Sequence, residues 1–167
     1  AFANGVVPPV SAPEHKNARG FFNNYAPAID KPLKDVIEWQ WNAWRDGLPK
    51  QPRSRTPTQT PDLRLIQGYA RNTSELSPPM VTWIGHASML VRLAGKNMLF
   101  DPVFSPRASP FGFVGPQRVV PLPIRIAELP HIDLVMVSHN HYDHLDADSV
   151  QQLAAQPGGS PRFLVPQ

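Results

Sequence analysis

The stretch from Leu134 to Asp146, L-V-M-V-S-H-N-H-Y-D-H-L-D, constrains the fold of this chain more than any other. It begins with a short apolar run, Leu134 to Val137, which has the length and composition of a buried strand. Four potential metal ligands follow within six residues: His139, His141, Asp143 and His144. Imidazole nitrogen and carboxylate oxygen are the ligands that Zn²⁺ and similar ions prefer. The stretch therefore predicts a metal-binding loop at the end of a buried strand.

The chain after this loop reads as a helix and a further strand. Asp146 is a good N-cap for residues 146–155, D-A-D-S-V-Q-Q-L-A-A, and Pro157-Gly158-Gly159 ends the helix. Residues 162–165 then predict one more strand. The alternative is a solvated loop that is merely rich in His. Close, fixed spacing of the ligands favours the metal site.

Three short strands are predicted upstream, over residues 81–84, 88–93 and 97–100. Two turns, Gly85-His86-Ala87 and Ala94-Gly95-Lys96, separate them, so the strands should form a meander that leads into the metal strand. Asp101 ends the third strand, where an Asp is commonly a turn former. From the residues alone, His86 is an ordinary loop histidine and His131 a structural one.

Residues 102–123 predict a long loop rich in Pro, Gly and Ser, with an apolar tip at residues 111–114, F-G-F-V. Two interpretations of the tip stay open. It either packs into the core, or Phe111 and Phe113 form a wall of the substrate cleft or a contact with lipid.

The N-terminal third is unusual because 21 of the 167 residues of the chain are proline, many of them there. Residues 4–31 read as an extended arm, and residues 48–62 as a Pro-rich linker. Between them, residues 32–47 predict an amphipathic helix that carries Trp39, Trp41 and Trp44. The apolar face of this helix packs either on its own domain or a partner subunit, or on a membrane. We divide the chain into an N-terminal region, residues 1–62, and a domain over residues 63–167.

Composition narrows the class of protein. The net charge of +3 comes from scattered Lys and Arg, which does not favour nucleic acid as a partner. No apolar run approaches the length of a membrane span, so we expect a soluble or peripheral protein. The absence of cysteine excludes disulfides and thiolate ligands. The start, Ala1-Phe2-Ala3, resembles the end of a signal-peptide cleavage site, which leaves cytoplasm and periplasm both open.

Several motifs together resemble one family. The motif S-H-N-H-Y-D-H-L-D at residues 138–146 resembles the H-x-H-x-D-H signature of the metallo-β-lactamase superfamily, and in particular the branch of N-acylphosphatidylethanolamine-hydrolysing phospholipase D and its bacterial relatives. Further matching segments are T-W-I-G-H-A-S at 82–88, D-P-V-F-S at 101–105, R-A-S-P at 107–110, G-P-Q-R at 115–118 and E-L-P at 128–130. The resemblance covers about residues 80 to 167.

The resemblance implies an α/β fold, a four-layer αβ/βα sandwich of two similar halves. This chain looks like the first half, and we expect the missing C-terminal half, another chain or a second copy to complete it. In the family the second half supplies one more His for each of two zinc ions and a bridging Asp. By the same resemblance, His139 and His141 serve the first zinc, and Asp143 and His144 the second. Asp101 and His86 would lie behind the ligands, Asp101 orienting a ligand histidine.

The activity implied by the resemblance is zinc-dependent hydrolysis through a hydroxide shared by two metal ions. The substrate would be a phospholipid phosphodiester, cleaved as a phospholipase D does, and Asp143 would also handle protons. One alternative is the same scaffold acting on a soluble lactone, a sugar phosphate or nucleic acid. A second alternative is a fragment or binding module without catalysis.

Overall fold

The computed structural model describes residues 16–17, 20–21, 32–48, 54, 56–71 and 78–166. The chain divides into two compact units, residues 1–50 and 51–167, and each is described by itself. Most of the predicted arm at 4–31 and part of the linker at 48–62 lie outside the described residues. The domain boundary at residue 62 stays a prediction.

The first unit contains a helix with an exposed apolar stripe. β1 (Lys16–Asn17) and β2 (Gly20–Phe21) form a short antiparallel pair. Helix α1 (Leu33–Arg45) follows Pro32 and ends before Gly47, which confirms the helix predicted from the sequence. None of its residues is buried, and Trp41 and Trp44 are 60% and 70% exposed with ring centroids 5.1 Å apart. What the stripe contacts stays a prediction.

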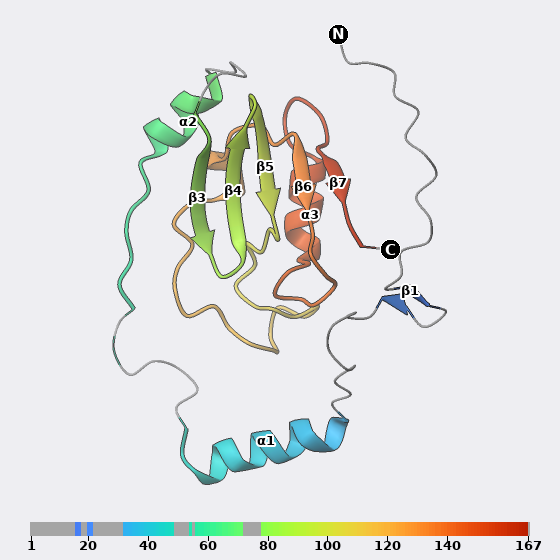
Figure 1. Ribbon diagram of the computed structural model, residues 1–167. Helices are drawn as coiled ribbons and strands as arrows, with labels where there is room; N and C mark the ends of the chain where they lie inside the picture. The colour runs from blue at the N-terminus through green and yellow to red at the C-terminus, as the bar shows by residue number, and fades with distance from the viewer. Residues whose placement is uncertain are drawn as a thin grey trace. The chain divides into compact units, whose positions relative to one another are not determined.

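The second unit is built on a five-stranded sheet of order β3-β4-β5-β6-β7 (Figure 1). The strands are β3 (Met80–Gly85), β4 (Ser88–Leu93), β5 (Lys96–Phe100), β6 (Leu134–Met136) and β7 (Arg162–Leu164). The first three pair antiparallel, while β6 and β7 run parallel to β5. The predicted meander and the α/β class are both confirmed.

One face of the sheet forms the core. Leu90, Leu99 and Val135 occupy matching positions on β4, β5 and β6, and each is at most 1% exposed. Side chains alternate between faces along a strand, so these three point to the same side. Helix α3 (Ala147–Ala154) lies behind the sheet in Figure 1 and adds Leu153 to the same core cluster.

The opposite face of the sheet is also apolar but exposed. Trp83 pairs with Met89 across β3 and β4, and these side chains are 70% and 39% exposed. Leu164 on β7, in register with Met136 of β6, is 52% exposed. On folded proteins, exposed apolar surfaces of this kind are typical of sites where another polypeptide or a ligand binds.

In the described part of the second unit, the sequence did not predict helix α2 (Leu63–Arg71) or the 3₁₀ helix η1 (Ile126–Glu128). The Asp62 carboxylate accepts a hydrogen bond from Leu65 N at 3.0 Å, which caps α2. Ile66 is 3% exposed in the core cluster, and Gln67 Nε2 donates to Glu128 O at 3.1 Å. Within the described ranges, no helix is both long and apolar enough to span a bilayer.

The loop over residues 102–123 lacks helix and strand, as predicted, but it is folded back on itself. Arg107 forms an isolated antiparallel bridge with Gln117, and its Nη1 donates to Gly115 O at 2.7 Å. Gly115 has φ +94°, and a Cβ there would lie 2.7 Å from Ser109 Cβ, so this turn requires glycine.

The tip of this loop projects into solvent. Phe111 and Phe113 are 56% and 83% exposed, and their ring centroids lie 5.8 Å apart. The interpretation in which the tip packs into the core is therefore wrong. The interpretation as a substrate or lipid contact stays open.

Candidate metal centre

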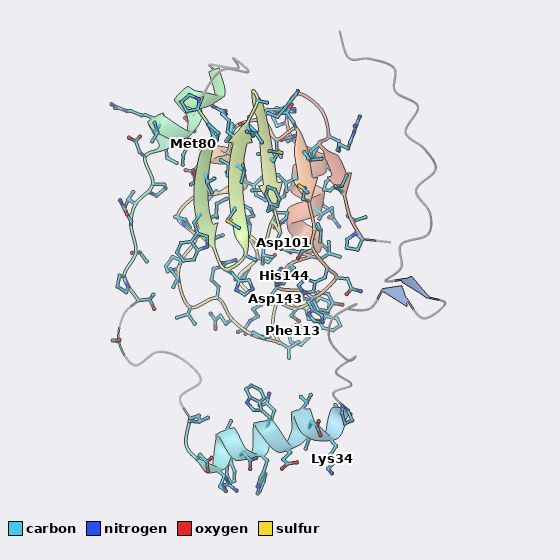
Figure 2. The ribbon with its side chains drawn as sticks, viewed as in Figure 1. Lys34, Met80, Asp101, Phe113, Asp143 and His144 are labelled. Atoms are coloured by element: carbon cyan, nitrogen blue, oxygen red, sulfur yellow. The ribbon has the colours of Figure 1, made fainter. Side chains whose placement is uncertain are left out.

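The candidate ligands gather at the carboxyl ends of β5 and β6. Phe100 pairs with Met136 in the parallel ladder, and Asp101 N donates to Met136 O at 2.8 Å. Asp101 therefore lies level with the start of the loop that follows β6. Figure 2 shows Asp101, His144 and Asp143 one below the other at this end of the sheet.

Asp101 anchors the metal loop. Its Oδ1 accepts a hydrogen bond from Ser138 N at 2.7 Å, and its Oδ2 accepts one from Ser138 Oγ at 2.8 Å. His144 Nδ1 lies 2.9 Å from the same Oδ2. Burial raises the pKa of Asp101, but the hydrogen bonds from His144 and Ser138 outweigh it and hold the pKa below the ordinary value. The carboxylate thus fixes the proton of His144 on Nδ1 and leaves the lone pair of Nε2 available to a cation.

Asp143 lies between two histidines. Its Oδ2 is 3.0 Å from His86 Nε2 and 3.6 Å from His144 Nε2. Ligand atoms of these three residues all lie within 4.8 Å of one another. Burial raises the pKa of Asp143, but its own backbone N–H, the hydrogen bond with His86 and the charges of His144 and His86 outweigh it and lower the pKa. Asp143 is therefore ionised at neutral pH and available to a cation.

His139 and His141 form a second pair. His139 Nε2 lies 3.1 Å from His141 Nδ1, and His139 Nδ1 lies 2.9 Å from Ser138 Oγ. The rings of His139 and His144 have centroids 4.0 Å apart, so the two pairs are adjacent. His141 is exposed and His139 is half-buried, which leaves the cluster open to solvent.

These distances can be tested against the geometry of zinc. With bonds of about 2.0–2.1 Å, two ligand atoms on a tetrahedral zinc lie roughly 3.3 Å apart. The His139–His141 separation of 3.1 Å and the Asp143–His144 separation of 3.6 Å bracket that value. Imidazole and carboxylate donors are also the usual zinc ligands. Each pair therefore has a separation compatible with two ligands of one metal ion.

Asp146 is the N-cap residue of helix α3, as predicted, but its side chain has another role. Helix α3 does begin after it, but its carboxylate makes no side-chain cap to the helix backbone. Its oxygens instead accept hydrogen bonds from Phe104 N at 3.1 Å, Ser105 N at 2.9 Å, Ser105 Oγ at 2.8 Å and Ser149 Oγ at 2.5 Å. Burial raises the pKa of Asp146, and these hydrogen bonds more than offset it. Asp146 thus ties the start of the 102–123 loop to the end of the metal loop.

Of the other residues considered in the sequence, Phe113 lies at the metal end of the sheet and His131 lies outside the cluster. Figure 2 shows Phe113 at the same end of the sheet as Asp143 and His144. His131 Nδ1 lies 3.1 Å from Pro157 O, in keeping with a structural role. Ser138, which touches Asp101, His139 and His144, was missed. Its place directly before the first motif histidine was the available signal.

Comparisons with known proteins point to one family. Residues 96–166 match the family described as "Beta-lactamase superfamily domain". A protein of Mycobacterium tuberculosis is 37% identical over 151 residues, covering 88% of this chain and 37% of its own length. "N-acyl-phosphatidylethanolamine-hydrolyzing phospholipase D 1" of Caenorhabditis elegans is 50% identical over 72 residues, 43% of this chain and 20% of its own. A "UPF0173 metal-dependent hydrolase" of Sulfurisphaera tokodaii is 30% identical over 79 residues, 47% of this chain and 30% of its own.

The chain thus spans between about a fifth and two fifths of the length of these relatives. The matched segment contains β5, β6, α3 and the loop with all four candidate ligands. The resemblance seen in the sequence motifs is therefore confirmed: over residues 96–166 the chain is similar to the β-lactamase superfamily domain, and it has relatives named as phospholipase D and as metal-dependent hydrolase.

Proposed function

We propose that this protein is a zinc-dependent hydrolase of phosphodiesters whose substrate is a phospholipid, cleaved as a phospholipase D does. The observation that carries the proposal is the convergence of His139, His141, Asp143 and His144 at one end of the sheet, at separations that suit zinc. The relatives named as metal-dependent hydrolase and as phospholipase D support the reaction class.

The residues of this chain would share the work as follows. His139 and His141 would hold one ion, and Asp143 and His144 the other. Metal ions held by these residues would activate a water for attack and neutralise charge that develops on the phosphate. Asp101 keeps His144 in the tautomer that binds through Nε2. Asp143, ionised and solvent-accessible, could accept a proton and pass it to the leaving group.

A lipid substrate is supported by the loop beside the site. The Phe111 and Phe113 side chains are exposed on a tip that internal hydrogen bonds hold in shape, and Phe113 lies at the metal end of the sheet. Exposed aromatic rings of this kind insert readily into the interfacial region of a bilayer. We propose that the tip contacts the acyl or interfacial part of the substrate while the phosphate reaches the metals.

A further part of the proposal concerns the exposed sheet face that contains Trp83, Met89 and Leu164. We propose that additional polypeptide covers it, either a continuation of this protein or a second chain. Each large apolar side chain removed from water there would contribute about 1.5–3 kcal/mol if fully buried. The same polypeptide would supply the ligands that each metal pair still needs.

The test is a hydrolysis assay of the intact protein with zinc. N-acylphosphatidylethanolamine in vesicles is compared with a soluble lactone and a sugar phosphate. We expect release of phosphatidic acid from the vesicles, abolished by His139→Ala and unchanged by His131→Ala, because His131 contacts Pro157 outside the cluster. Turnover of only the soluble substrates would replace the lipid assignment, and a zinc-loaded protein without hydrolysis of any of them would refute the proposed activity.

A further inference from the structure

His86 reaches the metal cluster from a segment distant in sequence, the turn between β3 and β4. Its backbone has φ +51°, an uncommon conformation for a residue other than glycine, and follows a register shift between Trp83 and Gly85. Trp83 Nε1 donates a hydrogen bond to His86 O at 2.9 Å, which fixes the turn. A non-glycine residue held in this conformation is typical of functional positions.

The side chain of His86 makes one polar contact with the cluster. Its Nε2 lies 3.0 Å from Asp143 Oδ2, and its ring meets the His144 ring edge-on with centroids 5.4 Å apart. An ionised Asp143 can only accept a hydrogen bond, so the proton of this contact sits on His86 Nε2. The hydrogen bond therefore fixes the rotation of the Asp143 carboxylate about its Cβ–Cγ bond.

The rotation of this carboxylate decides whether Asp143 and His144 can bind the same ion. With His86 in contact, Asp143 Oδ2 lies 3.6 Å from His144 Nε2, a separation that suits two ligands of one zinc. His144 is fixed independently by Asp101. Each of these two residues thus has a hydrogen-bond partner that orients it: Asp101 for His144, and His86 for Asp143.

We infer that His86 is a positioning residue: it holds the Asp143 carboxylate in the orientation that binds metal next to His144, and so sets the zinc affinity of that ion's site. The inference rests on the proposed function in so far as Asp143 is a metal ligand. It assigns to the β3–β4 turn a part in metal binding that the motif at residues 139–144 does not contain.

Two substitutions separate the side-chain contact from the shape of the turn. Gln places its amide nitrogen as many bonds from Cα as Nε2 of His, so His86→Gln can still donate to Asp143. Asn is one bond shorter and cannot reach, yet it tolerates a positive φ better than most residues. His131→Asn serves as the matched control, because His131 is exposed and contacts Pro157.

Zinc affinity is measured in the intact protein by competition with a chromophoric chelator, for each ion bound, and the unfolding temperature of the metal-free variants confirms that they fold. We expect His86→Asn to lower the affinity for one zinc ion by about 10–100-fold, the range for loss of a group that orients a ligand. His86→Gln and His131→Asn should stay close to wild type.

Other outcomes overturn the inference in distinct ways. If Asn is tolerated and Gln is not, the turn conformation matters and the contact does not. If Gln and Asn weaken zinc binding equally, His86 is a direct ligand. If neither substitution changes the zinc affinity, His86 does not contribute to metal binding. Zinc affinity is measured without substrate. If the variants show the expected zinc affinities but the protein hydrolyses no phosphodiester, only the proposed function is refuted.

Discussion

Replacing Asp101 by Asn tests how the metal loop is held. The Asp101 side chain, 12% exposed, accepts hydrogen bonds from Ser138 N, Ser138 Oγ and His144 at 2.7, 2.8 and 2.9 Å. Hydrogen bonds to a charged acceptor contribute about 1.5–3 kcal/mol, and those to a neutral one about 0.5–1.5 kcal/mol. Asn removes the charge and turns an NH₂ group towards one of the donors. Ser138 is exposed and can turn to water, so we expect a loss of about 2–4 kcal/mol of unfolding free energy.

The assay is urea unfolding of the intact, metal-free protein, followed by zinc titration. Asp148→Asn is the control, since Asp148 is an exposed residue of α3 and surface substitutions usually change stability by less than about 0.5 kcal/mol. Asp101→Asn should also lower the affinity for zinc by about 10–100-fold, because His144 loses the partner that fixes its tautomer. Equal stability and equal zinc affinity in the two variants would refute the assigned role of Asp101.

Three further predictions concern other parts of the second unit. Burial raises the pKa of Asp133, but the hydrogen bonds that its carboxylate accepts from Lys96 and Asn97 outweigh this effect and lower the pKa. The ionised carboxylate therefore stabilises the fold above the ordinary pKa of about 3.9, and this stabilisation is lost as the pH falls below that value. Asp133→Asn should therefore flatten the acid side of the stability profile, and an unchanged profile would contradict this. Changing Phe111 and Phe113 to Ser should reduce binding to phospholipid vesicles, whereas unaltered binding would remove the tip from the lipid contact. Residues 1–167 expressed alone should expose the open sheet face and aggregate or bind a hydrophobic dye, and a monodisperse, cooperatively unfolding monomer would contradict the proposed covering layer.

Local sequence patterns predicted most strands of the second unit. The turns at Gly85-His86-Ala87 and Ala94-Gly95-Lys96 and the apolar run before Ser138 predicted β3 to β6 to within a residue or two at each end. Helix α2 escaped because it is short and Gly68 interrupts it, although Asp62 before Leu63 was a cap signal.

The candidate site was predictable in its ligands and less so in what surrounds them. Four ligands within six residues must lie close together, whatever the rest of the chain does. Asp146 is the N-cap residue as predicted, but its carboxylate does not cap the helix backbone, because its oxygens accept hydrogen bonds from the backbone of Phe104 and Ser105. This contact joins segments about forty residues apart, so local propensity does not contain it. The contact of His86 with Asp143 likewise depends on the sheet register that brings the β3–β4 turn to the metal loop.

The central claim, that the loop at residues 139–144 builds a two-ion zinc site, is tested most directly by metal analysis of the intact, active protein. Inductively coupled plasma mass spectrometry should find two zinc ions per chain in the wild type and fewer in His139→Ala, with the variant still folded by circular dichroism. Removal of the metal by a chelator should abolish hydrolysis, and zinc should restore it. Active protein that contains no transition metal would contradict the account.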